Sequence, residues 1–168
     1  MIADELDIVS GPRLESRPEV ATLGIRESVP FRTMLSNRDR LLAELIDWLS
    51  VHGVQPPGPF FLRLHVVDMQ GLMEIEVGVV ASNDAADRRV KSGVLPSGEY
   101  AVLAYRAKSM AANRRLHAWV IEQGITLDSR PDPGGEFFAA RCEIYVTDPR
   151  TEKRKNHWIV ELAFLTRK

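Results

Sequence analysis

The chain has 168 residues, of which 45% are hydrophobic and 27% charged, as in an ordinary globular protein of one domain. Its formal net charge of −1 gives no electrostatic reason to expect a nucleic acid or an anionic membrane as a partner. The single cysteine, Cys142, excludes an internal disulfide, and its place in an apolar strand face predicts a buried, inert thiol. The start of the chain lacks the pattern of a signal peptide, and no apolar run could span a bilayer, so we expect a cytoplasmic protein.

The first half of the chain alternates between strand and helix patterns. Residues 1–18 are rich in turn-forming and acidic residues and predict a loosely held lead-in, followed by one domain over 19–168. Leucines at helical spacing, with Gly53 after them, predict an amphipathic helix. The elements expected here are a strand over 20–29, a helix that ends at Gly53, and a hairpin of strands over 60–67 and 73–80.

The second half repeats this order after a short additional strand. The elements expected are strands over 89–95 and 100–106, a helix from Ser109 to Gly124, a loop over 128–135, a strand through Glu143 that stops at Asp148-Pro149, and a last strand over 157–165.

Two stretches of the chain share one pattern. Leu45–Val54 and Leu116–Ile125 both read Leu-x-x-Trp-[Leu/Val]-x-x-x-Gly-[Val/Ile], and each lies between a strand and a hairpin. This favours a duplicated β-α-β-β unit, with pseudo-repeats over about 19–86 and 87–168. Such a pair of units predicts an α+β fold: one antiparallel sheet, both helices on one face, and a groove between them floored by the middle strands.

The strand around Glu143 carries the main functional signal. Strand alternation places Cys142 on one face and Glu143 and Tyr145 on the other. If that second face is covered, the carboxylate needs a cationic partner, such as Arg63 or Arg141, or it becomes a place where cations or protons are handled. Both alternatives remain open on the strand pattern alone.

Several motifs, taken together in their order, are typical of one family. They are Pro59-Phe60, Met73–Val79, Gly93–Ala101, Met110–Asn113 leading to Trp119, and above all Glu143-Ile144-Tyr145 with Asp148-Pro149. On these residues the chain, over about 19–165, resembles the GyrI-like small-molecule-binding family, the effector-binding domain of AraC- and MerR-type regulators. It departs from the family at Ala107-Lys108-Ser109, where members usually have Gly and then an aromatic residue.

The resemblance implies a fold and several functions. The fold is the duplicated, SHS2-like β-α-β-β unit. Members bind bulky, often lipophilic or cationic, compounds in the central groove, faced by a glutamate at the position of Glu143. Some stand-alone members hydrolyse strained cyclopropane-bearing cytotoxins, and one protects DNA gyrase from inhibitors. The implied partner is therefore a hydrophobic or cationic small molecule, with a protein such as gyrase as a further alternative.

We therefore expect a stand-alone binder that senses or sequesters drugs or toxins, with a hydrolase as the alternative. In the hydrolase, Glu143 would be the general base and Tyr145 or Tyr105 would hold the substrate carbonyl. We expect no cofactor and no metal, because the four histidines lie on different elements without ligand spacing. The candidate ligand-binding residues are Glu143, Tyr145, Tyr105, Trp119, Phe60, Phe137 and Trp158.

Overall fold

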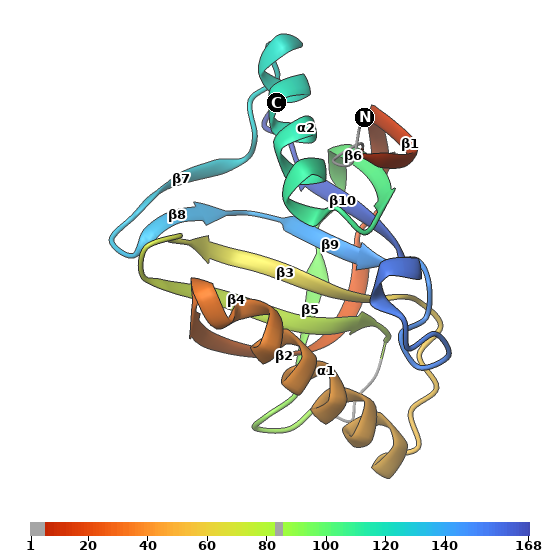
Figure 1. Cartoon of the computed structure of the whole chain (residues 1–168). Helices are drawn as coiled ribbons and strands as arrows, with labels where there is room; N and C mark the ends of the chain where they lie inside the picture. Colours follow the sequence, from red (N-terminus) through yellow and green to blue (C-terminus); the bar gives the residue numbers. More distant parts are fainter. Residues whose placement is uncertain (1–5, 83–85) are drawn as a thin grey trace.

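A computed structural model describes residues 6–82 and 86–168 of the chain. Within them it contains ten β-strands, two α-helices and two short 3-10 helices (Figure 1). In chain order these are β1 (Asp7–Arg17), β2 (Val20–Pro30), η1 (Phe31–Thr33), α1 (Met34–Val51), β3 (Phe60–Val67), β4 (Leu72–Val80), β5 (Lys91–Leu95), β6 (Gly98–Arg106), α2 (Ser109–Glu122), β7 (Ser129–Asp132), β8 (Gly135–Phe138), β9 (Arg141–Tyr145), η2 (Lys155–His157) and β10 (Ile159–Leu165).

The strands form one antiparallel sheet in the order β1-β6-β10-β9-β3-β4-β2-β5, with the β7–β8 hairpin attached to β3. Both helices cover the same face, α1 over β2 and β4 and α2 over β6, while β9 and β3 lie between them (Figure 1). The predicted α+β fold with one antiparallel sheet and two helices on one face is confirmed. Neither described α-helix combines the length and the apolar character that crossing a bilayer requires.

The core lies between the sheet and the helices because both present apolar stripes there. Alternate residues of β4, such as Met73, Ile75 and Val77, are buried against Leu41 and Leu45 of α1. Burying one such side chain stabilises the fold by roughly 1.5–3 kcal/mol. The period-2 pattern of the strands and the 3.6-residue pattern of the helix therefore meet in one layer.

The expectation of a loosely held lead-in was wrong for residues 7–17, which form β1. This strand pairs with β6 along its length, and its register shifts around Gly11-Pro12. An edge strand tolerates glycine and proline at such an irregularity, so these residues do not prevent pairing.

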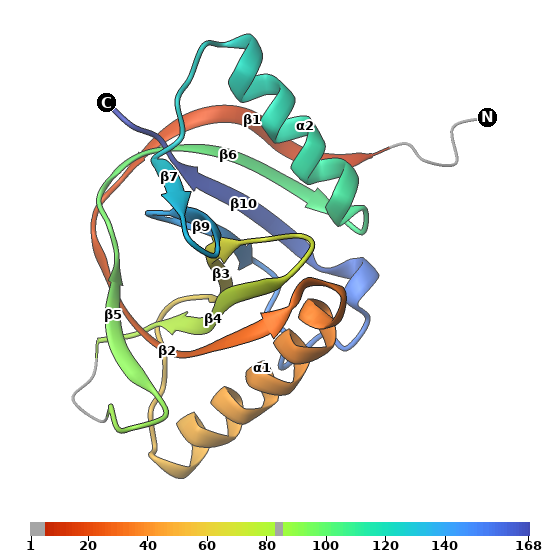
Figure 2. The same ribbon diagram turned by 90° about the vertical axis from the view of Figure 1, so that its left-hand side faces the viewer.

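The first strand of each half of the chain, β1 or β5, pairs with a strand of the other half. β1 and β2 follow one another almost without a break, as do β5 and β6. β1 then pairs with β6, and β2 pairs with β5 (Figure 2). The two long arms curve around the molecule and tie its halves together at two places.

Residues 128–135 were expected to be a loop, but most of them belong to the hairpin β7–β8. Asp132 pairs with Gly135 around a tight turn, and Phe137 of β8 pairs with Val66 of β3. The turn residues were visible in the sequence, whereas the pairing onto β3 depends on a distant segment. The limits of the domain and of its two pseudo-repeats remain a prediction.

Candidate functional site

Glu143 lies in the middle of an apolar row that crosses the sheet. Its neighbours on either side are Leu62 of β3 and Leu162 of β10, and the row continues to Val77 of β4 and Leu103 of β6. These four neighbours are fully buried, and Glu143 itself is only 7% exposed. The sheet thus places one carboxylate among aliphatic side chains, on a strand that lies between the two helices (Figure 1).

Burial makes the charged form of Glu143 unfavourable. Among residues 6–82 and 86–168, no hydrogen bond or ion pair joins its carboxylate to another side chain. Its pKa is raised because burial disfavours the carboxylate, an effect that the positive charges of Arg38 and Arg141 only partly offset. A buried carboxyl group of this kind is a common feature of functional sites.

Neither arginine that could have paired with Glu143 across the strands forms an ion pair with it. Arg63 reaches to the opposite face of the sheet, where it donates hydrogen bonds to the carbonyl oxygens of Val94 and Ala139 at 2.9 and 2.6 Å. Arg141 lies on the same face as Glu143 but packs on aromatic rings, with its carbon Cζ 4.8 Å from the centre of the Phe164 ring. The alternative in which Glu143 is a structural ion-pair partner of Arg63 or Arg141 therefore has no direct contact to support it.

Three aromatic side chains lie beside the Glu143 row, and two of them belong to the next row across the sheet. Tyr145 follows Glu143 on the same face of β9, and its ring centre lies 5.3 Å from that of Trp158. Tyr105 of β6 lies on the same row as Tyr145, since both face Val160 of β10. All three are buried, so the structure brings Glu143, Tyr145, Tyr105 and Trp158 into one cluster.

The two tyrosines of this cluster keep their protons. Burial, reinforced by the negative charge of Glu143, raises the pKa of both Tyr105 and Tyr145. Trp158 is fixed separately, because its ring nitrogen donates a hydrogen bond of 2.7 Å to the carbonyl oxygen of Glu152. The cluster therefore offers neutral hydroxyl groups and aromatic faces next to one carboxyl group.

Arg38 of α1 completes the cluster, although the sequence did not identify it as a site residue. It is 8% exposed, and its carbon Cζ lies 5.7 Å from the ring centre of Tyr145 and 5.8 Å from that of Trp158. Its Nη1 group donates a long hydrogen bond of 3.4 Å to the Tyr145 hydroxyl. A signal was present, because Arg38 stands at helical spacing before Leu41 and Leu42 on the apolar stripe of the helix.

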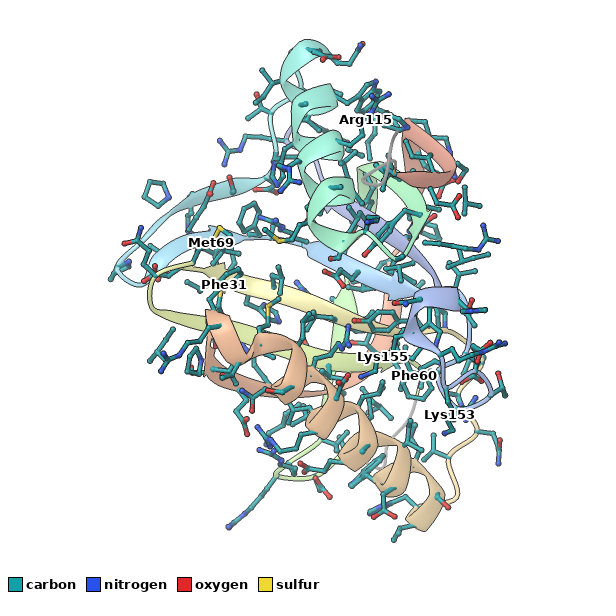
Figure 3. The ribbon with its side chains drawn as sticks, viewed as in Figure 1. Phe31, Phe60, Met69, Arg115, Lys153 and Lys155 are labelled. Atoms are coloured by element: carbon teal, nitrogen blue, oxygen red, sulfur yellow. The ribbon has the colours of Figure 1, made fainter. Side chains whose placement is uncertain are left out.

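Arg38 is tied to the rim of the cluster by Asp39. Its Nε and Nη2 groups donate to one oxygen of Asp39 at 3.1 and 2.8 Å, and Lys155 from the β9–β10 connection donates to the other oxygen. Lys155 stands in η2 on that connection (Figure 3). Burial would raise the pKa of Asp39, but the hydrogen bonds from Lys155 and Arg38 outweigh it and lower that pKa.

The remaining candidate residues are distributed over the core. Phe60 is buried opposite Tyr145 on the neighbouring strand, and so borders the cluster. Trp119 is partly buried on α2, packed against the main core. Phe137 lies at the other end of β3, where its ring centre is 4.1 Å from the Arg130 guanidinium carbon. The structure does not bring Phe137 to the Glu143 cluster.

A cavity of about 620 Å³ opens mainly on the opposite face of the sheet, and Phe60 and Tyr145 of the Glu143 cluster are among its lining residues, whereas Glu143 is not. Cys142, Ile144 and Ala163 line it, together with Tyr100, and its rim is rich in proline. Cys142 is buried, as expected, and burial raises the pKa of its thiol to about 12, which disfavours the reactive thiolate. The described residues hold no group of three or more His, Cys, Asp or Glu side chains arranged to bind a metal ion.

No family model matches the sequence, and no curated protein matches it. Solved structures do match the fold. The EcmrR chain in a DNA complex superposes with a TM-score of 0.73 at 16% identity over 93% of this chain, which spans 57% of that chain. The isolated EcmrR C-terminal domain gives a TM-score of 0.67 at 18% identity, with 93% of this chain and 96% of that domain covered.

Two further solved structures are similar to this chain. SAV2435 bound to tetraphenylphosphonium gives a TM-score of 0.61 at 16% identity, covering 92% of this chain and 93% of that one. A hydrolase from Listeria innocua gives a TM-score of 0.54 at 12% identity, with 93% of this chain and 92% of that chain covered. At these identities the likeness establishes the fold. The chain has the fold of the GyrI-like effector-binding domains, as its motifs predicted.

Proposed function

We propose that the chain binds hydrophobic small molecules, lipophilic cations among them, at the Glu143 cluster, and so senses or sequesters drugs or toxins. The observation that carries this proposal is the carboxylate of Glu143, which is only 7% exposed, has no bonded partner among the described residues and lies next to the rings of Tyr145 and Trp158. Aromatic faces attract a desolvated cation by roughly 0.5–2 kcal/mol each. A carboxylate adds attraction that grows as water is excluded.

The similar structure of SAV2435 supports the choice of ligand class. That protein was solved with tetraphenylphosphonium, a bulky cation whose charge is shielded by four aromatic rings. A ligand of this kind needs aromatic contacts and a single buried counter-charge rather than many hydrogen bonds. The Glu143 cluster offers this combination, which makes tetraphenylphosphonium the natural first probe.

The test compares a cation with a neutral molecule of similar shape. Tetraphenylphosphonium and uncharged triphenylphosphine oxide are titrated calorimetrically into the wild type and into Glu143→Gln. We expect the variant to bind the cation at least tenfold more weakly, a loss of about 1.4 kcal/mol, and the neutral molecule within about twofold of the wild type. Equal weakening of both ligands, or of neither, would contradict the proposed role of Glu143.

Two controls locate the binding. Glu74→Gln removes a carboxylate from β4 that pairs with Arg26 at 2.7 Å, so we expect it to leave cation affinity unchanged. Trp158 reports on the site by fluorescence quenching, and Trp158→Phe should abolish the ligand-dependent part of the signal. Trp158 does not line the cavity on the opposite face, so a ligand bound there should leave its fluorescence unchanged.

A second candidate function is hydrolysis of a strained, cyclopropane-bearing electrophile. The raised pKa of Glu143 and the protonated hydroxyl of Tyr145 favour it, and so does the fold shared with a Listeria innocua hydrolase. Glu143 would take a proton from water as the water oxygen bonds to a ring carbon. The ring C–C bond would break toward a carbonyl held by Tyr145, and the proton would return to the opened product.

Product analysis separates this function from simple binding. After incubation with such an electrophile, the wild type should yield the ring-opened, hydrated product, whereas Glu143→Gln should leave the substrate intact. Recovery of unchanged substrate from the wild type would exclude the hydrolase for that substrate class.

A further inference from the structure

We infer that Arg38 is an internal counter-ion that occupies the cation position of the Glu143 cluster, so that a cationic ligand binds only by displacing its guanidinium group. This inference rests on the proposed function and names what regulates the same site. It makes Arg38 a determinant of ligand specificity rather than a part of the core.

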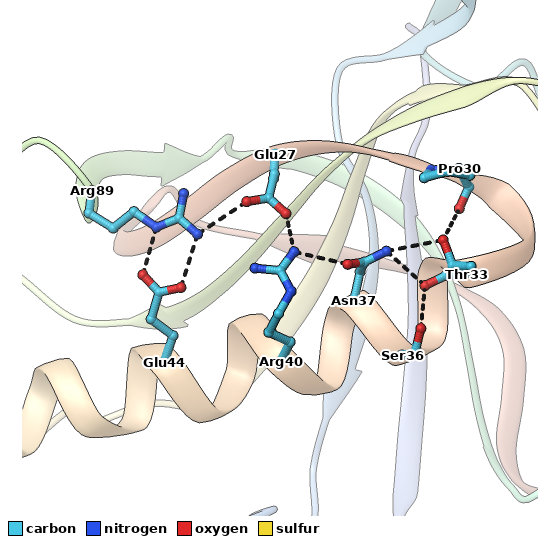
Figure 4. A network of polar contacts seen from close by, with 8 residues as sticks. All are labelled: Glu27, Pro30, Thr33, Ser36, Asn37, Arg40, Glu44 and Arg89. Carbon is cyan, nitrogen blue, oxygen red and sulfur yellow. Dashed lines mark hydrogen bonds and ion pairs between the residues drawn. The ribbon is translucent and has the colours of Figure 1, made fainter.

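The first support is the position of Arg38 on its helix. Arg40, two residues further along α1, has a half-exposed side chain that pairs with Glu27 in an exposed network (Figure 4). Arg38 instead stands on the apolar stripe and is buried at the cluster. Burying a guanidinium group is costly unless partners compensate for the lost water, so its place requires a physical reason.

The second support is that Arg38 makes the contacts expected of a bound cation. Its charged carbon lies within 6 Å of the ring centres of both Tyr145 and Trp158, the range in which a cation is attracted to an aromatic face. Its positive charge is also the largest of those that favour the ionised form of Glu143. The guanidinium group thus supplies the charge that a lipophilic cation would bring.

The third support is that Arg38 is bound by Asp39 at the rim of the cluster and not by Glu143. Two of its nitrogen groups donate to Asp39, whose side chain is partly exposed at the rim. The inner contact is a single long hydrogen bond to the Tyr145 hydroxyl. The side chain can therefore turn outward while it keeps its pairing with Asp39, and no ion pair to Glu143 has to break.

The experiment removes the internal charge and measures tetraphenylphosphonium binding by calorimetry. Arg38→Met keeps an unbranched apolar stem but has no charge, and we expect it to bind the cation at least tenfold more tightly than the wild type. Arg38→Lys restores a positive charge and should stay within about threefold of the wild type. The matched control is Arg40→Met, which removes an exposed charge from the same helix and should change nothing.

Two comparisons establish that charge is the cause. The gain should be smaller by at least threefold for neutral triphenylphosphine oxide, and it should disappear in the double variant Arg38→Met/Glu143→Gln. If both ligands gained equally, Arg38 would be only a steric plug and the inference would be overturned. Should Arg38→Met fail to fold, Arg38→Gln, whose amide can still donate to Asp39, gives the same test.

The outcomes separate this inference from the proposed function. If Arg38→Met binds the cation no better than the wild type, while Glu143→Gln still weakens the wild type, Arg38 is not an internal competitor and the binding function stands. If no folded variant binds tetraphenylphosphonium, the proposed cation binding fails, and the role of Arg38 fails with it.

Discussion

The two faces of the sheet treat buried charges in opposite ways. On the face away from the helices, Glu76 accepts a hydrogen bond of 2.8 Å from His65, and Arg63 donates to two backbone carbonyl oxygens. On the helix face, Glu143 is more deeply buried than Glu76 or Arg63 but has no bonded partner in the described chain. Buried charges of a structural kind are normally paired. The unpaired carboxylate is therefore the feature of the helix face on which the proposed ligand site rests.

The pKa values of the two glutamates show the same contrast. Burial would raise the pKa of Glu76, but the hydrogen bond and charge of His65 and the nearby Arg63 outweigh it and lower that pKa. For Glu143 burial prevails, and the pKa is raised. A glutamate is thus stabilised as an anion on one face of the sheet, at Glu76, and destabilised as an anion on the other, at Glu143.

The largest effect should come from breaking the paired charges. Glu76→Ala leaves the buried His65 without its acceptor, which we expect to lower the free energy of unfolding by about 3 kcal/mol. Urea denaturation at pH 7 measures this loss. Glu74→Ala, on the same strand and partly exposed, should lower it by less than about 1 kcal/mol. Similar losses for both variants would show that the pairing of Glu76 has no special weight.

Glu143→Gln should raise the free energy of unfolding at pH 7 instead of lowering it. Because the folded state raises the pKa of Glu143, its stabilising contribution is complete below the ordinary pKa near 4.5 and is lost as the pH rises through the folded value. At pH 7 the variant should therefore be more stable than the wild type, by about 1.4 kcal/mol for each unit by which the pKa is raised.

This second prediction is checked by urea denaturation of both proteins between pH 4 and pH 8. The difference in the free energy of unfolding should grow with pH and vanish at the acid end. A variant that is less stable than the wild type at pH 7 would show that the carboxylate stabilises the fold, as a structural ion pair does.

The smallest effect should come from the rim. Lys155→Met removes an exposed ammonium group that donates to Asp39, and such pairs contribute less than about 1 kcal/mol to stability. The pKa of Asp39 should rise, because the hydrogen bond from Lys155 is the foremost of the contacts that lower it. Denaturation and carboxyl NMR titration measure the two effects. A loss well above 1 kcal/mol would place Lys155 among the structural charges.

Local patterns were sufficient for the features that depend on local sequence. The alternation around Glu143 predicted which face it shares with Tyr145, and the leucine spacing predicted α1. Pairing between distant segments was not visible, so the strand over residues 7–17 was missed. Arg38 was missed for another reason: its place on an apolar stripe was in the sequence, but only the packed structure shows which rings it meets.

The exchanged arms of the two halves limit how the molecule can admit a ligand. β1 pairs with β6, and β2 pairs with β5. The two halves therefore cannot separate by a hinge motion without breaking strand pairs at both ends of the sheet. A ligand of the proposed kind must instead enter by rearrangement of side chains or of one helix, while the strand pairs stay intact. Amide exchange in β9 and β3 should accordingly stay slow while a ligand comes and goes.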